Sequence, residues 1–150
     1  MVDERDKKII EILRKDPDIT VRALANKADL PTSTIHRRLK ILRHKGIIKG
    51  RKILLDWGKI GRPIGILVFI DVIPEKKSLQ KPSDPVNKVV TELEKLDEVE
   101  EILITEGERD ITVKARLESL KQIREFLDEV MNIQDVHEIE SCIIIDEIYK

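Results

Sequence analysis

Residues 30–50 read LPTSTIHRRLKILRHKGIIKG and combine regularly spaced apolar residues with dense positive charge. Ile35, Leu39 and Leu42 follow the i, i+4, i+7 spacing that places side chains on one face of an α-helix. A helix is therefore predicted over residues 32–45. At 100° per residue, four side chains fall within about 40° of the face opposite Ile35: Ser33, Arg37, Lys40 and His44. That face is hydrophilic and mostly cationic.

Two helices are predicted before this one. Asp3 is expected to cap a helix whose core face is formed by Ile9, Ile10 and Leu13, and Thr20 to cap a second helix, VRALANKA. A helix with a basic outer face, held by a preceding helix across a short turn, has the shape that fits the major groove of DNA. An ordinary solvated charged face is the alternative interpretation, since charged runs are usually only solvated.

The segment IIKGRKILLD after Gly46 predicts two short strands that turn at residues 49–51, where Gly50 permits the backbone conformation. A wing of this kind contacts phosphates, which gives affinity without sequence information. Three helices and a wing form a winged helix-turn-helix. The candidate DNA-binding residues are Ser33, Thr34, His36, Arg37, Arg38, Lys40, His44, Lys49, Arg51 and Lys52.

Charge divides unevenly along the 150 residues. Residues 1–62 hold 17 Lys and Arg against 8 Asp and Glu, residues 63–150 hold 11 against 21, and the total is −1. Such asymmetry indicates a polyanion-binding module joined to something else. The stretch WGKIGRPIG has three glycines and a proline, so the predicted parts are a DNA-binding domain over 1–56, a hinge over 57–64 and a second domain over 65–150.

The acidic half predicts a strand, a helix, two strands, a helix and a final strand, the order of a ferredoxin-like βαββαβ domain. The strands lie in PIGILVFIDVIP, VEEILITEGERDITVKARL and ESCIIIDEIY, and the helices in PVNKVVTELEKLDE and SLKQIREFLDEVM. The fold class is therefore α+β. Helices cover only one face of such a sheet, so either Ile66, Val68 and Ile70 or Leu67 and Phe69 are left for a partner, most simply a second copy of the chain.

Several function classes lack sequence support. No apolar run approaches the length of a membrane span, and the start MVDERDKK has no apolar signal region, so a cytoplasmic protein without a membrane partner is expected. Cys142, the single cysteine, is predicted to be reduced and buried. No phosphate loop, metal-ligand spacing or nucleophile motif is present, so no cofactor, metal site or catalytic residue is predicted.

Taken together, TVRALANKADLPTSTIHRRLKILRHKGIIKG followed by VEEILITEGERDITVKARL resembles the Lrp/AsnC family of transcription regulators, also called feast/famine regulatory proteins. The resemblance covers essentially the whole chain. It implies a homodimer, often assembled into octamers or larger discs, that binds double-stranded DNA through its N-terminal domains. It also implies a C-terminal domain, called RAM, that senses small effectors, commonly amino acids.

The resemblance places the effector between dimers, beside the turn joining the second and third strands. The implied effector-binding residues are Thr105, Glu106, Gly107, Glu108, Arg109, Asp110 and Ser141. An amino acid needs backbone N–H groups around its carboxylate and an acidic side chain near its ammonium. The family's common turn is Gly-Asp-Tyr-Asp, and here Glu108 and Arg109 replace the middle pair, which changes the expected effector; a plain turn without a ligand is the alternative.

Two further alternatives stay open. Some siroheme decarboxylases share this two-domain plan, but they use histidines and aromatic residues, and here the second domain has only His137, Tyr149, Phe69 and Phe126. An enzyme is therefore not expected. A nucleoid protein that wraps DNA with little sequence preference is compatible with the sequence, as are an activator and a repressor. No role is predicted for the polar segment 74–85.

Overall fold

The computed structural model describes residues 2–50, 52–73 and 84–149. The chain divides into two compact units, Met1–Leu54 and Leu55–Tyr149, and each is described by itself. In the described part of the chain, no helix is long and apolar enough to cross a membrane.

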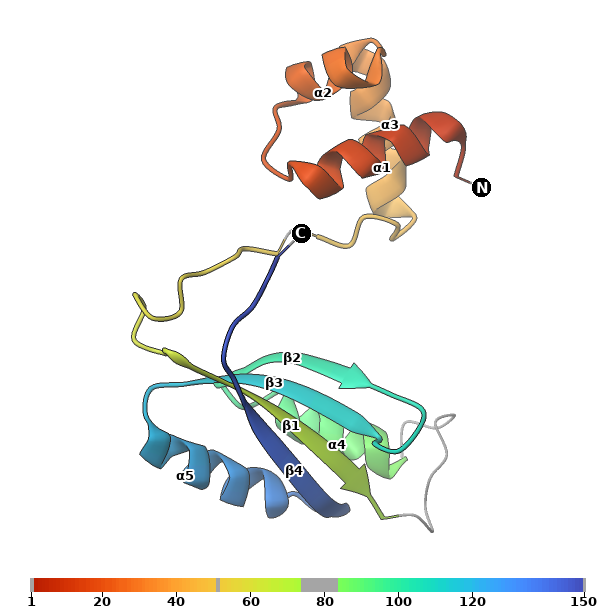
Figure 1. Ribbon diagram of the computed structural model, residues 1–150. Coiled ribbons are helices and arrows are strands. Elements are labelled where there is room, and N and C mark those ends of the chain that lie inside the picture. Colours follow the sequence, from red (N-terminus) through yellow and green to blue (C-terminus); the bar gives the residue numbers. More distant parts are fainter. Residues whose placement is uncertain (1, 51, 74–83, 150) are drawn as a thin grey trace. The chain divides into compact units, whose positions relative to one another are not determined.

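The first unit is a bundle of three helices (Figure 1). They are α1 (Glu4–Lys15), α2 (Val21–Ala28) and α3 (Thr32–His44). The predicted caps are confirmed. Asp3 accepts a hydrogen bond from the backbone N–H of Asp6 while the Asp6 side chain accepts one from Asp3, and Thr20 accepts one from Ala23. These bonds satisfy N–H groups that a helix start otherwise leaves unpaired.

The core of this unit confirms the predicted helix faces. Its buried residues are Ile9, Ile19, Leu24, Ala25, Ala28, Ile35, Leu39 and Leu42. Ile10 and Leu13 are partly buried against them. Because Ala25 and Ala28 are small, α2 can approach its neighbours closely.

The end of α3 explains why the predicted wing strands are wrong for the described residues. Gly46 adopts φ +67°, its N–H donates to the Arg43 carbonyl, and the N–H groups of Ile47 and Ile48 both donate to the Leu42 carbonyl. This Schellman-type cap uses the donors that a first strand would need. Residues 46–50 and 52–56 contain no strand. An isolated two-stranded ribbon is marginal in any case.

The second unit is a four-stranded antiparallel sheet with two helices (Figure 1). Its elements are β1 (Ile64–Val72), α4 (Pro85–Leu93), β2 (Val99–Ile104), β3 (Ile111–Leu117), α5 (Leu120–Met131) and β4 (Val136–Ile144). The strand order is β2-β3-β1-β4, so β1 and β3 are central. The predicted βαββαβ order is confirmed. Of the segment 74–85, Asp84 caps α4 and Pro85 begins it, and the remainder lies outside the described residues.

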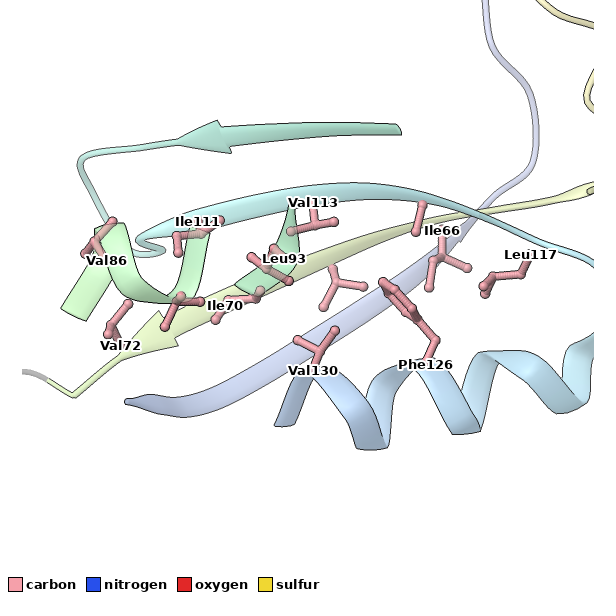
Figure 2. Packing of buried hydrophobic residues seen from close by; sticks show 13 residues of the cluster. Ile66, Ile70, Val72, Val86, Leu93, Ile111, Val113, Leu117, Phe126 and Val130 are labelled. Atoms are coloured by element: carbon pink, nitrogen blue, oxygen red, sulfur yellow. The ribbon is translucent and has the colours of Figure 1, made fainter. Parts of the chain in front are cut away.

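Both helices cover the same face of the sheet, where their apolar sides pack on the central strands (Figure 2). Ile66, Val68 and Ile70 are fully buried there. Leu67 and Phe69 are half-buried and lie on the other face, here called the open face. Of the two sets left open by the sequence, the pair Leu67 and Phe69 is therefore the one that α4 and α5 do not cover.

The prediction of a buried Cys142 is wrong. Cys142 pairs with Leu67, so its side chain lies on the open face, and it is exposed. The apolar run around it suggested burial, but β4 is an edge strand and only one face of the sheet carries helices.

Candidate functional site

The outward face of α3 carries exposed polar side chains above a buried apolar face. The exposed residues from the predicted set are Ser33, His36, Arg37, Lys40 and His44, and Thr34 is half-buried. Arg37 and Lys40 form no ion pair with any described residue. The structure thus brings together, on one rigid helix, two cations that are free to bind an anion.

Arg38 differs from its neighbours because its guanidinium is turned toward α1. Its Nη1 atom lies 2.7 Å from Asp3 Oδ2 and 2.7 Å from Asp6 Oδ1, and its side chain is only 15% exposed. The hydrogen bonds with Asp6 and Asp3 raise the pKa of Arg38. The Asp6 backbone N–H, followed by Arg38, lowers the pKa of Asp3. Arg38 therefore fastens α3 to the start of α1, a role that helix periodicity did not suggest.

The segment after α3 keeps its cations exposed although it forms no strand. Lys49 and Lys52 are both exposed. Arg51 lies outside the described residues. An irregular segment can still place lysines against phosphates, because such contacts need charge and reach more than a fixed geometry.

The turn between β2 and β3 is closed by its own hydrogen bonds. The Thr105 N–H donates to the Asp110 carbonyl at 2.9 Å, and the Thr105 hydroxyl donates to the Arg109 carbonyl at 2.6 Å. Gly107 has φ +153°, a conformation that favours glycine. Glu106, Gly107 and Glu108 are exposed at the tip. The turn presents acidic side chains and backbone to solvent.

Asp110 ties this turn to β1. Its Oδ2 accepts the Val72 N–H at 2.8 Å, and its own N–H donates to the Ile70 carbonyl at 3.1 Å. One carboxylate oxygen is thus used within the fold. This interaction orients the start of β3 against the end of β1.

Arg109 is held by two carboxylates. Nη1 lies 2.7 Å from Asp71 Oδ2 and Nη2 lies 2.7 Å from Glu140 Oε1. Partial burial lowers the pKa of Arg109, but the charges of Glu140 and Asp71 more than offset this, so the pKa lies above its ordinary value. The positive charge that distinguishes this turn is neutralised on the open face.

Within one chain, Ser141 does not lie beside Arg109 and its partners. It pairs with Val68 and so shares the face that carries the helices, whereas Glu140 pairs with Phe69 on the open face. His137 lies on β4 and is exposed. In the described part of the chain, no three His, Cys, Asp or Glu side chains are grouped to hold a metal ion.

Comparison with known proteins decides between families that share these two folds. A family model described as winged helix-turn-helix DNA-binding matches residues 2–49. A second, described as the Lrp/AsnC ligand binding domain, matches residues 68–150. The chain belongs to the Lrp/AsnC family. Its resemblance to these regulators, first seen in residues 20–50 and 99–117, is confirmed.

Relatives of this Lrp/AsnC chain include regulators from archaea and bacteria. It is 33% identical to the HTH-type transcriptional regulator FL11 of Pyrococcus furiosus, over 97% of this chain and 90% of that protein. It is 31% identical to the regulatory protein AsnC of Haemophilus influenzae, over 93% of this chain and 87% of the relative.

Solved structures share the Lrp/AsnC fold along nearly the whole chain. An AsnC family transcriptional regulator from Agrobacterium tumefaciens superposes with a TM-score of 0.79 at 22% identity, covering 99% of this chain and 93% of that one. A feast or famine regulatory protein from Mycobacterium tuberculosis, in complex with L-methionine, gives 0.84 at 23% identity, covering 100% and 96%. A transcriptional regulator from Neisseria meningitidis, also in complex with L-methionine, gives 0.82 at 20%, covering 100% and 94%.

Sequence reasoning missed Asp71 and Glu140 as partners of Arg109. The signal was present but non-local. Asp71 interrupts an otherwise apolar strand, and such a residue usually has a charged partner.

Proposed function

We propose that this Lrp/AsnC-type regulator recognises a specific DNA sequence with the outward face of α3. The supporting observation is the contrast within that helix. Arg37 and Lys40 are exposed and pair with no carboxylate in the described part of the chain, while Arg38 is bound by Asp3 and Asp6. An arginine at the outer face of a recognition helix can bind guanine through two hydrogen bonds. Lys49 and Lys52 are assigned to phosphate contacts, together with Arg51, which lies outside the described residues.

A homodimer follows from the open face of the sheet. Leu67 and Phe69 are not covered by α4 or α5, and Leu103, which lies on the same face of the sheet, is half exposed. Soluble monomers rarely expose that much clustered apolar surface. Light scattering at micromolar concentration is expected to show at least a dimer, and a monodisperse monomer would contradict this.

Selection of bound fragments from random DNA tests the regulator against the architectural alternative. A regulator is expected to enrich a common sequence and to bind it about 10³-fold or more tightly than scrambled DNA at physiological salt. An architectural protein would enrich no sequence and would bind both DNAs alike, with a steep salt dependence. Failure to enrich a sequence would therefore contradict specific recognition.

We further propose that the turn over residues 105–110 binds an amino acid or a related small effector. The L-methionine complexes of two structural neighbours support an amino acid as the class to test first. Because Asp71 and Glu140 already neutralise Arg109, attraction of an acidic effector by Arg109 is weakened. The exposed Glu106 and Glu108 leave the turn acidic, which favours an ammonium group at this edge.

A screen of the twenty amino acids by thermal shift and calorimetry tests the effector site. Hits are repeated with Arg109→Ala and with Asp110→Asn, which keeps an oxygen for the Val72 N–H while removing the charge. Weakened binding, or an altered balance between dimers and larger assemblies, is expected in at least one variant. If wild type binds no amino acid at millimolar concentration and assembly is unchanged in both variants, the turn over residues 105–110 is not an effector site.

A further inference from the structure

Four charged side chains form a compact cluster on the open face, at the opposite end of β1 from the Arg109 group. They are Glu100 of β2, Lys114 and Arg116 of β3, and Glu147, which follows β4. Arg116 pairs with Gly65 at the start of β1, whereas Asp71 lies near its end. The Arg116 side chain is only 6% exposed, so this is an almost buried arginine on a face without helices.

Both cations of the cluster share both carboxylates. Arg116 Nε lies 2.8 Å from Glu100 Oε2, and Arg116 Nη2 pairs with Glu147. Lys114 Nζ lies 3.4 Å from Glu100 and also pairs with Glu147. Burial raises the pKa of Glu147, but its hydrogen bonds with Lys114 and Arg116 outweigh this, and the pKa lies below its ordinary value. Glu147 is thus held in its charged form.

The cluster also contacts the segment that leads from the first unit. The Arg116 guanidinium carbon lies 5.2 Å from the centre of the Trp57 ring, within the range of a cation–π contact. The Arg62 N–H donates to the Trp57 carbonyl at 2.9 Å, and Arg62 Nη1 donates to the Asp97 carbonyl at 2.6 Å. Residues 57–62, near the start of the second unit, are therefore fastened to the rest of that unit at two points, Arg116 and Asp97.

Gly65 provides the space for this arrangement. A Cβ atom at position 65 would lie 2.6 Å from Arg116 Nη1 and 3.2 Å from a methyl carbon of Ile144. The first distance is far below any real contact. Because Glu100 and Glu147 hold the guanidinium in place, it can clear a methyl group only by leaving its partners or the Trp57 ring.

We propose that Arg116 is a positioning residue for DNA binding. It anchors the linker between α3 and β1 to the ligand-binding domain by its contact with Trp57. Arg116 depends on its ion pair with Glu147 to hold this position. This inference rests on the proposed function for its DNA consequence. A fixed anchor at Trp57 shortens the free part of the linker. In a dimer, a shorter free linker restricts the DNA half-site spacings that the two helix-turn-helix units can reach together.

Trp57 is the single tryptophan of the chain, so its fluorescence reports the anchor directly. Three variants of the full chain disturb Arg116 in different ways. Glu147→Gln removes one partner without touching Trp57. Gly65→Ala changes no charge but displaces the guanidinium. Arg116→Lys keeps the charge but loses the planar group that stacks on an aromatic ring.

All three variants are expected to increase acrylamide quenching of Trp57 and to shift its emission to the red. The matched controls are Glu125→Gln, on the exposed side of α5, and Gly50→Ala, where a Cβ meets nothing within 4 Å. Circular dichroism identifies any variant that fails to fold. Wild-type quenching in folded Glu147→Gln and Gly65→Ala would overturn the anchor.

A second experiment measures DNA binding on two duplexes, each with two copies of the selected half-site. One duplex keeps the selected spacing, and the other has about five base pairs added between the half-sites, which is half a helical turn. Wild type is expected to prefer the selected spacing, and the three variants to lose that preference while keeping their affinity for a single half-site. An unchanged preference in variants with released Trp57 would overturn the positioning role. Absence of DNA binding by wild type would overturn the proposed function and this role, while the fluorescence would still decide the anchor.

Discussion

The outward face of α3 and the open face of the sheet both carry arginine and lysine, but they use them in opposite ways. On α3, Arg37 and Lys40 are exposed and have no ion-pair partner among the described residues. On the sheet, Arg109, Lys114 and Arg116 each pair with two carboxylates. Paired cations stabilise the fold, whereas unpaired ones on a rigid surface remain available to a polyanion. Positive charge therefore indicates a DNA interface only where the fold leaves it unpaired.

Arg116→Ala is expected to give the largest effect, on stability. Removing Arg116 takes one cation from Glu100 and Glu147, whose side chains are only 11% and 22% exposed, and this should lower the free energy of unfolding by about 3 kcal/mol. Urea denaturation measures this. Arg37→Ala is the matched arginine control and is expected to change stability by less than about 0.5 kcal/mol. Equal losses of unfolding free energy in Arg116→Ala and Arg37→Ala would contradict the contrast between paired and unpaired arginines.

Arg38→Ala is expected to lower the melting temperature of the protein by a smaller amount. Its partner Asp3 is 52% exposed while Asp6 is 14% exposed, so losing the contact leaves one of the two carboxylates largely hydrated. Because the guanidinium faces α1, the ratio of specific to non-specific DNA affinity should stay near that of wild type. A loss of specificity at unchanged stability would show that Arg38 contacts bases instead.

Lys49→Ala is expected to weaken binding to the selected site and to random DNA alike. Losing one phosphate contact reduces the slope of log affinity against log salt by about 0.9. A salt titration on both DNAs measures the slope. A loss confined to the selected site would mean that this irregular segment reads bases.

The smallest expected effect is on the free energy of unfolding at acidic pH. The pKa of Glu147 is lowered in the folded protein, so its contribution is fully present above the ordinary glutamate value of 4.5 and is lost as pH falls through the lower folded value. Lys114 and Arg116 pair with Glu147, Glu100 shares both cations, the Asp146 carboxylate accepts the Glu147 N–H, and the Tyr149 ring lies against Lys114. The stability difference between wild type and Glu147→Gln should therefore shrink as pH falls below 4.5. A constant difference would contradict the charged pairing.

The fold was largely predictable from the sequence because it depends on local patterns. Apolar spacing located the helices, and caps such as Asp3 and Thr20 marked where they begin. The predicted wing strands were wrong for the described residues because they rested on propensity alone. The N–H groups of Ile47 and Ile48 are taken by the α3 cap, a competition that strand patterns do not contain.

The candidate sites were less predictable because they depend on contacts between distant residues. The helical wheel separated Arg37 from the core but could not show that Arg38 would meet Asp3, 35 residues earlier in the chain. In the same way, Arg109 meets Asp71, which is 38 residues away. The resemblance pointed to the turn, but only the register of β1 with β4 shows that Ser141 and Glu140 lie on opposite faces.

The most direct test of the DNA-reading face is Arg37→Ala on the selected site and on random DNA, with Lys7→Ala on α1 as the matched removal of one charge. Arg37→Ala is expected to cost roughly 1–3 kcal/mol on the selected site and much less on random DNA. Lys7→Ala is expected to leave the ratio of the two affinities unchanged, because Lys7 pairs with Glu4. Equal losses on both DNAs for Arg37→Ala would contradict base reading by this face and reduce Arg37 to a phosphate contact.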